Sequence, residues 1–172
     1  MKQLFRLLKI LLFSRFRSPV SLLDEGEVTF RVWPNDLDPL LHMNNGAYLT
    51  LLDLGRIDLT IRSGLSKVAK ANNVYAVVAS EAIRFRKSLT PFMKFSIKTR
   101  CVYWDQRYFF VQQRFEVRGK VAAQAIIKGC LLKKNGDRVS PGEIIKQLGL
   151  PETPPPMPDL VRHFLATDSL LQ

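Results

Sequence analysis

The sequence has few of the side chains that usually build metal sites and disulfide frameworks. Its 172 residues include two cysteines, Cys101 and Cys130, and two histidines, His42 and His163. The cysteines lie in separate apolar stretches without a CxxC spacing, which favours buried thiols in a reducing compartment over a disulfide or metal ligands. We therefore expect a cytoplasmic protein without a metal site.

Long apolar runs are also missing. In the amino-terminal stretch the longest uninterrupted run is Ile10–Phe13, far short of the roughly 20 residues of a membrane span or the about 7–15 of a secretory signal. Helical spacing instead separates two faces. The apolar face contains Leu4, Leu7, Leu8, Leu11 and Leu12, and the basic face contains Lys2, Arg6, Lys9 and Arg17.

Such a helix fits two interpretations. It can lie in a membrane interface with its basic residues towards anionic headgroups, which would make residues 1–17 a peripheral membrane contact. It can also pack on its own domain or a partner subunit, with the basic face in solvent. The sequence leaves both open.

Acidic residues are scarce relative to basic ones: the chain has 15 Asp and Glu but 26 Lys and Arg, which gives a net charge of +11. This surplus indicates attraction to an anionic partner such as lipid, nucleic acid or a phosphorylated cofactor. Nucleic acid is not expected, because the chain has no RNP-like, zinc-finger or helix-turn-helix pattern. Residues 1–23 hold five basic and no acidic residues, so almost half of the net charge comes from this segment.

The periodicity predicts an α+β domain. Alternation in EVTFRVWP predicts a strand that ends at Pro34, and apolar residues at helical spacing predict a long, mostly buried helix from Asn45 to about Ser63, stopped by Gly64. Period-two patterns then predict four further strands, at residues 74–87, 94–104, 107–118 and 121–134. Their short connectors indicate an antiparallel meander.

A curved antiparallel sheet wrapped around one long central helix satisfies this order of elements, because the helix covers the apolar face of the sheet. Ser140–Glu143 has the spacing of a capping box and predicts a short helix through Leu148. We divide the chain into an amphipathic helix (1–23), the core domain (24–150) and a proline-rich tail with a short helix (151–172).

The segment Asp36–Tyr48, DLDPLLHMNNGAY, carries a family resemblance. The DxDP element ending in Asp38 resembles the catalytic loop of 4-hydroxybenzoyl-CoA thioesterases, and HMNN resembles the HVNN of acyl-ACP thioesterases. The whole run most resembles thioesterase superfamily member six and its bacterial relatives. The resemblance covers about residues 27–150 and implies the hotdog fold.

The resemblance also implies roles for residues of this segment. Asp38 would be the base or nucleophile that a thioester hydrolase needs. Asn45, where the long helix begins, would supply a backbone N–H to the oxyanion, and His42 would orient water, stabilise the carboxylate or act as an acid. The segment departs from the family patterns at two places. Leu40 lies where acyl-ACP thioesterases have a polar residue, and Leu41–His42–Met43 lies where the 4-hydroxybenzoyl-CoA group has a Gly–Ile/Val–Val-type stretch.

Structural interpretations stand beside the catalytic ones. Asp36 and Asp38 can stabilise the loop through Asx-type hydrogen bonds, and His42 can be a half-buried histidine. Asn44 is the expected helix cap. Tyr48 is either a core residue or a substrate contact.

Further along the chain, two groups of polar residues each have a structural and a functional interpretation. Asp53 and Arg56 have the spacing of an intrahelical ion pair, with closure of a substrate tunnel as the alternative. Three basic residues on one predicted strand could bind coenzyme A phosphates or protect a sheet edge by their charge: Arg84, Arg86 and Lys87.

The sequence thus predicts an acyl-CoA or acyl-carrier thioesterase. Its site would be a tunnel at a dimer interface, in a homodimer or homotetramer, and coenzyme A would enter only as part of the substrate, with no other cofactor. The alternative is a non-catalytic acyl- or lipid-binding protein at a membrane surface. A dehydratase acting on 3-hydroxyacyl thioesters is a third hypothesis, which would need Asp53 as its acidic residue.

Overall fold

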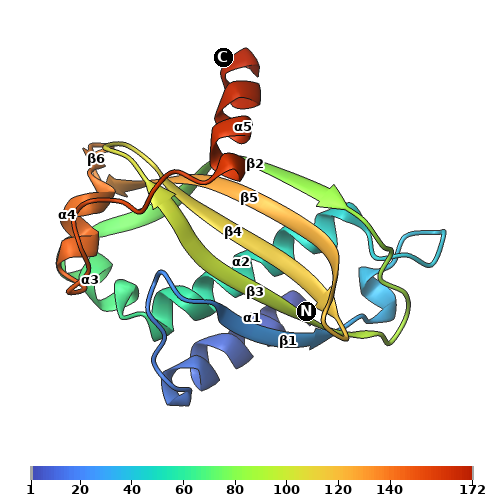
Figure 1. Cartoon of the computed structure of the whole chain (residues 1–172). Coiled ribbons are helices and arrows are strands. Elements are labelled where there is room, and N and C mark those ends of the chain that lie inside the picture. Colours follow the sequence, from blue (N-terminus) through green and yellow to red (C-terminus); the bar gives the residue numbers. More distant parts are fainter. Residues whose placement is uncertain (1, 172) are drawn as a thin grey trace.

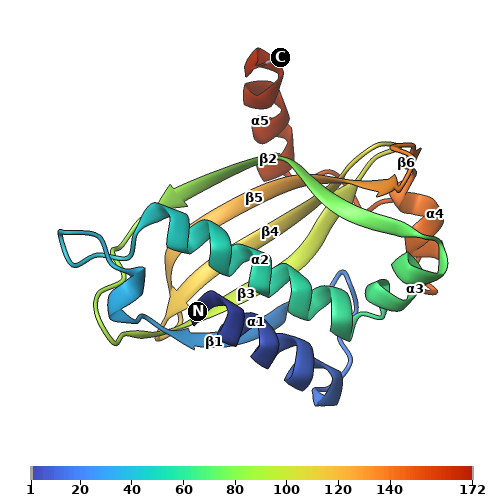
Figure 2. The same ribbon diagram turned by 180° about the vertical axis from the view of Figure 1, so that it is seen from behind.

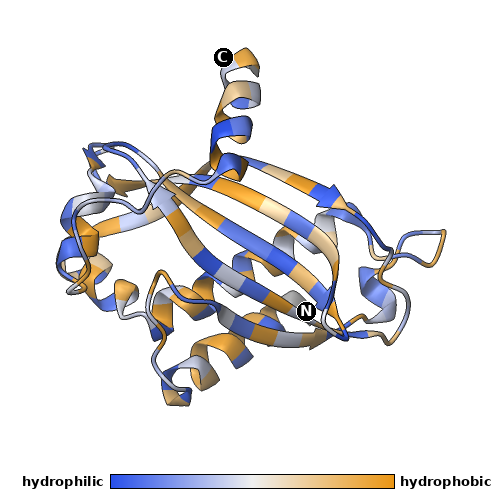
Figure 3. Ribbon diagram, viewed as in Figure 1, coloured by the Kyte–Doolittle hydropathy of each residue, from blue (hydrophilic) through white to orange (hydrophobic). Residues whose placement is uncertain are grey.

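The computed structural model describes residues 2–171 of the chain, and the side chains of residues 4–170. A six-stranded antiparallel sheet curves around one long helix, α2 (Asn45–Arg62), which lies along one face (Figures 1 and 2). Hydrophobic and hydrophilic residues alternate along its strands (Figure 3), as expected where one sheet face packs on a core. The predicted α+β arrangement is confirmed.

The strand order across the sheet differs from the predicted meander. The order is β1 (Gly26–Arg31), β3 (Lys94–Trp104), β4 (Phe109–Val117), β5 (Lys120–Lys133) and β2 (Val74–Phe85), with the short β6 (Arg138–Val139) also on β5. The meander is correct for β3, β4 and β5. It is wrong for β2, which pairs with β5 at the far edge of the sheet.

The connection between β2 and β3 explains this difference. Residues 86–93 do not form a tight hairpin but run across the end of the sheet to β1, where Val32 exchanges backbone hydrogen bonds with Met93 and Phe92. Because β1 pairs with β3 along its whole length, it occupies the edge that a meander would give to β2.

Helix α2 packs closely on the sheet because of one glycine. A Cβ atom at Gly55 would lie 2.8 Å from both Thr99 Oγ1 on β3 and Gln113 Nε2 on β4. The core between helix and sheet is closed by fully buried apolar side chains, among them Leu51, Leu52, Phe95, Ile97, Phe115 and Ile127. Gly64, with a φ of +80°, ends the α2 region as predicted, and an additional short helix, α3 (Leu65–Ala71), follows.

The amino-terminal helix α1 (Lys2–Phe13) continues into the 3-10 turn η1 (Ser14–Phe16) and packs on α2. Packing on the domain is therefore confirmed. The solvated basic face is correct for Lys9 and Arg17, which are exposed, but wrong for Arg6, which is buried, and the predicted apolar face is largely exposed. The side chain of Lys2, assigned to the basic face, lies outside the described residues. In the described part of the chain no helix is long and apolar enough to cross a membrane.

The carboxyl-terminal part forms two helices joined by an extended segment. Helix α4 (Pro141–Lys146) begins at the predicted proline, but the predicted capping box is wrong: the Ser140 side chain makes no capping hydrogen bond, and the helix ends before Leu148. Helix α5 (Asp159–Asp168), followed by the turn η3 (Ser169–Leu171), packs on the sheet face opposite α2. Cys101 and Cys130 are buried free thiols, as predicted, and burial raises the pKa of Cys101 to about 12.

Candidate functional site

The motif segment forms a loop whose two ends are fixed by backbone hydrogen bonds. It begins with the 3-10 turn η2 (Pro34–Asp36) and ends at Asn44. The N–H of Met43 donates to the carbonyl of Leu89 at 2.8 Å, and the N–H of Asn44 donates to the carbonyl of Asp36 at 2.7 Å. Because Met43 is also buried in the core, the loop is anchored where it meets α2.

Asp38 organises the tip of this loop. Its Oδ1 accepts the N–H of Leu40 at 2.9 Å and of His42 at 3.1 Å, while its own N–H donates to the carbonyl of His42 at 2.8 Å. These contacts hold Leu41 at a φ of +57°, a conformation that costs a non-glycine residue free energy. The Asx-type interpretation is thus confirmed. The catalytic interpretation stays a prediction, and Oδ2 accepts no hydrogen bond from any described residue.

The asparagines sit at the start of α2 as expected. Asn44 caps the helix, since its Oδ1 accepts the N–H of Gly46 at 2.8 Å. Asn45 is the first helical residue, and its N–H finds no acceptor among residues 2–171. A free N–H at the positive end of an 18-residue helix is suited to an oxyanion. In the loop before this helix, His42 and Leu40 are both exposed.

Asp36 has a partner that sequence reasoning missed. The Arg6 guanidinium donates from Nη1 to Asp36 Oδ1 at 3.0 Å and from Nη2 to Asp36 Oδ2 at 2.9 Å, and both side chains are buried. Asp36 Oδ2 also accepts the N–H of Trp33, so the loop-stabilising role is confirmed as well. No local signal could have revealed the ion pair, because the two residues are 30 positions apart.

Tyr48 occupies the core position that was one of its two interpretations. Its ring makes edge contacts with Phe85 and Phe115, each at a centroid distance of 4.9 Å. Burial raises the pKa of the Tyr48 hydroxyl, against the opposing effect of a hydrogen bond with the Leu89 backbone. Contact of Tyr48 with a substrate stays a prediction.

An apolar groove of about 820 Å³ runs between α2 and β2. Its polar lining includes Asp53 and Arg56, which form the predicted ion pair. Arg56 Nη1 also donates to Gln113 Oε1 at 2.9 Å, and Gln113 Nε2 donates in turn to the carbonyl of Leu52. A buried polar network thus orients the Asp53–Arg56 pair beside an apolar space. None of the predicted catalytic residues, Asp38, His42 and Asn45, lines the groove of the same chain.

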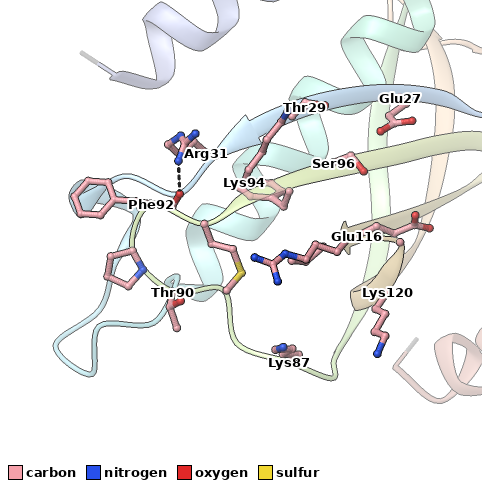
Figure 4. A pocket seen from close by; sticks show the side chains of 16 residues that line it. Glu27, Thr29, Arg31, Lys87, Thr90, Phe92, Lys94, Ser96, Glu116 and Lys120 are labelled. Atoms are coloured by element: carbon pink, nitrogen blue, oxygen red, sulfur yellow. Dashed lines mark hydrogen bonds between the residues drawn. The ribbon is translucent and has the colours of Figure 1, made fainter.

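A second cleft, of about 1000 Å³, lies where several strands end together (Figure 4). Of the three basic residues predicted to bind coenzyme A, only Lys87 lines it; Arg84 and Arg86 are exposed outside it. Sequence reasoning missed four other basic residues of this cleft, Arg31, Lys94, Arg118 and Lys120. Arg31 pairs with Lys94 across β1 and β3, and the β4–β5 hairpin turn lies at the same end of the sheet. The pairing register of the strands, which brings these four basic residues to one end of the sheet, is the signal that could have revealed them.

Comparison with protein families gives one match that covers most of the chain. Residues 32–165 match the family described as the thioesterase-like superfamily. Over 134 residues, 77% of this chain and 65% of the relative, the sequence is 36% identical to the protein THEM6 of Danio rerio. The chain spans between 38% and 65% of the length of four curated relatives that it matches.

Comparison with solved structures agrees on the fold. YbaW, a probable thioesterase of Escherichia coli, superimposes with a TM-score of 0.67 at 21% identity, over 71% of this chain and 94% of that one. A DHNA-CoA thioesterase of Staphylococcus aureus gives a TM-score of 0.61 at 12% identity, over 86% and 95%. At these identities the similarity shows the fold alone, and this fold is the predicted hotdog fold.

Proposed function

Since this chain belongs to the thioesterase-like superfamily, we propose that it hydrolyses the thioester bond of an acyl-coenzyme A or of an acyl group on a carrier protein. One observation carries the proposal. A loop within the matched region holds the Asp38 carboxylate by two backbone N–H groups, and this loop leads directly into the amino terminus of α2. The name of the DHNA-CoA thioesterase supports the coenzyme A thioester as substrate class.

In the proposed reaction Asp38 acts as the general base, with attack by its carboxylate on the carbonyl as the covalent variant. Its Oδ2 takes a proton from water, the water oxygen bonds to the thioester carbon, and the carbonyl oxygen becomes an oxyanion. The Asn45 N–H and the helix dipole stabilise that charge. The C–S bond then breaks, and the thiolate leaves with a proton returned from Asp38, directly or through His42.

The site requires a second copy of the chain in this proposal. Strand β2 has one unpaired edge in the described structure and exposes Tyr75, Val77 and Val78, which is unusual for an edge strand that remains uncovered. Twofold pairing through β2 would be antiparallel and would place the Phe85 end of one strand against the Val74 end of the other.

This pairing would complete the groove. The motif loop contacts Leu89, just beyond the Phe85 end of β2, whereas the groove is lined by residues 76–78 near the other end. Antiparallel pairing therefore brings the Asp38 loop of one chain to the groove of its partner. The apolar groove would then hold the acyl chain.

Phosphate binding completes the proposal. Lys87 lines the strand-end cleft together with four other basic residues (Figure 4), and Arg84 and Arg86 lie three residues and one residue before Lys87 on the same stretch. Clustered Lys and Arg are suited to the phosphates of coenzyme A. Two acidic residues, Glu27 and Glu116, line the same cleft, and Lys98 and Arg114 neutralise Glu116 through ion pairs.

Hydrolysis of a panel of aliphatic and aromatic acyl-CoAs, followed by release of free thiol, tests the proposal. Asp38→Asn should lower kcat by about 10²–10⁴-fold, the usual range for loss of a general base. Asp24→Asn, an exposed acid outside the loop, is the matched control and should keep the wild-type rate. Unchanged turnover in Asp38→Asn would overturn the role of Asp38.

The exposed Leu40 beside Asp38 favours the second candidate function, acyl or lipid binding without hydrolysis. The same experiment separates the two candidates. Wild-type protein that binds acyl-CoA but releases no thiol from any member of the panel would support the binding function and contradict the hydrolase.

A further inference from the structure

Helix α1 is oriented with polar side chains towards the domain. The positions that face inward, Arg6, Ile10 and Ser14, follow at a spacing of four residues and are all buried. Arg6 pairs with Asp36 through two hydrogen bonds, and Ser14 Oγ donates to Asp58 Oδ1 at 2.7 Å. Because a buried carboxylate without its partner is costly, these contacts determine which side of α1 faces the domain.

Further contacts to Asp58 hold the end of this segment. Arg17 Nη1 donates to Asp58 Oδ1 at 3.0 Å, and Arg62 Nη1 donates to Asp58 Oδ2 at 3.1 Å. The Asp58 side chain is almost fully buried. Rotation of α1 about its axis would separate Asp36 from Arg6 and Asp58 from Ser14, so the outward side is fixed.

Most of the large side chains that α1 and η1 expose are apolar. Seven of its large hydrophobic residues are exposed: Leu4, Phe5, Leu8, Leu11, Leu12, Phe13 and Phe16. Single exposed apolar residues are common, but such a continuous group within one helix and its following turn indicates a surface that meets an apolar partner. Figure 2 shows α1 on the helical side of the sheet, next to α2.

The charges beside this face favour an anionic bilayer over a second copy of the chain. Lys9 and Arg15 are exposed there, and residues 1–23 contain no acidic residue. Two copies of this face would bring like charges together without a counter-charge. A bilayer with anionic lipids accepts the apolar residues between its headgroups and pairs with the basic ones.

We propose that the outward face of α1 and η1 seats the protein on the surface of an anionic membrane, with the helix axis in the plane of the interface. The proposal goes beyond thioester hydrolysis and does not depend on it. Leu4, Leu7 and Leu11 of the same helix also line the apolar groove, so the helix that meets the bilayer forms part of the wall of that groove.

Sedimentation of the full chain with vesicles tests the proposal. Vesicles of phosphatidylcholine alone are compared with vesicles that contain phosphatidylglycerol. The test variant carries Phe5→Glu and Leu12→Glu. The control carries Thr167→Glu and Leu170→Glu, two exposed residues near the other terminus, and it has the same net charge as the test variant.

Wild type and control should bind the anionic vesicles at least tenfold more tightly than the neutral ones, and the test variant should lose at least tenfold in affinity for the anionic vesicles. Circular dichroism and thermal unfolding check that both variants fold. Equal binding of test variant and control, or no binding by wild type, would overturn the proposal. So would a wild-type assembly that light scattering shows to be larger than that of the test variant, because the face would then cover a second copy.

Discussion

The two terminal helices lie on opposite sides of the sheet, α5 on the sheet itself and α1 on α2, and they pack in opposite ways. Helix α5 turns apolar residues inward, with Val161 and Phe164 on Val102, Phe110 and Ile126 of the sheet, and exposes Arg162, His163 and Thr167. Helix α1 and the turn η1 direct Arg6 and Ser14 inward to buried carboxylates and expose leucines and phenylalanines.

From this difference we infer that α5 mainly stabilises the fold, whereas α1 also presents an apolar surface to solvent. Apolar burial under α5 contributes stability in the ordinary manner. The polar contacts under α1 contribute less net stability, because desolvation of both partners offsets their attraction, but they determine one orientation. The apolar residues of α1 therefore remain available for a partner outside the chain.

The largest effect is expected from the acid that holds α1. Asp58→Ala removes the partner of Ser14, Arg17 and Arg62 and should lower the free energy of unfolding by about 3–5 kcal/mol, as for other buried ion pairs that lose one member. Urea denaturation measures this change in the free energy of unfolding. Asp53→Ala on the same helix, an acid whose side chain is exposed and paired with Arg56, is the control and should cost about 0–1 kcal/mol. Equal effects of the two would show that α1 is not held by Asp58.

An intermediate loss of stability is expected from a substitution in the apolar contact between α5 and the sheet. Phe164→Ala removes a nearly buried ring from the outer face of the sheet and should cost about 3 kcal/mol, the lower end for such truncations. The urea midpoint of Leu170→Ala, an exposed residue beyond the same helix, should stay unchanged. A cost below about 1 kcal/mol for Phe164→Ala would mean that α5 does not stabilise the domain by apolar burial.

The smallest effect concerns the ion pair at the end of α5. Hydrogen bonds from Lys128 and Ser80 hold the pKa of Asp168 below its ordinary value of 3.8. The stability that this pair contributes is therefore present above that pH and is lost as pH falls through the lowered pKa. Asp168→Asn keeps an acceptor oxygen but loses the charge, so it should cost about 1–2 kcal/mol at neutral pH.

Thermal unfolding as a function of pH checks the sign of this effect. The difference between wild type and Asp168→Asn should be constant at neutral pH and should shrink below about pH 4, as the wild-type carboxyl takes up its proton. A difference that grows on acidification would contradict the lowered pKa.

Much of the candidate site could be predicted from sequence because its parts are close in the chain. Asn44 as helix cap, Asn45 as the first helical residue and the loop hydrogen bonds of Asp38 all involve partners within four residues. The basic strand-end cleft could not be predicted in the same way. It joins residues of four strands, and of Arg84, Arg86 and Lys87 only Lys87 lines it. Binding of coenzyme A phosphates by these residues stays a prediction.

The sequence by itself determined the long helix α2, the strand segments and the hydrogen bonds of the motif loop, because hydrophobic periodicity, glycine stops and side-chain capping act over a few residues. The tertiary structure alone decided which edge of the sheet β2 takes and which side of α1 faces inward. Both depend on distant partners: β5 for the strand, and Asp36 and Asp58, 30 and 44 residues from Arg6 and Ser14, for the helix. A helical pattern shows that α1 has an apolar face, but only buried carboxylates elsewhere in the chain turn that face outward.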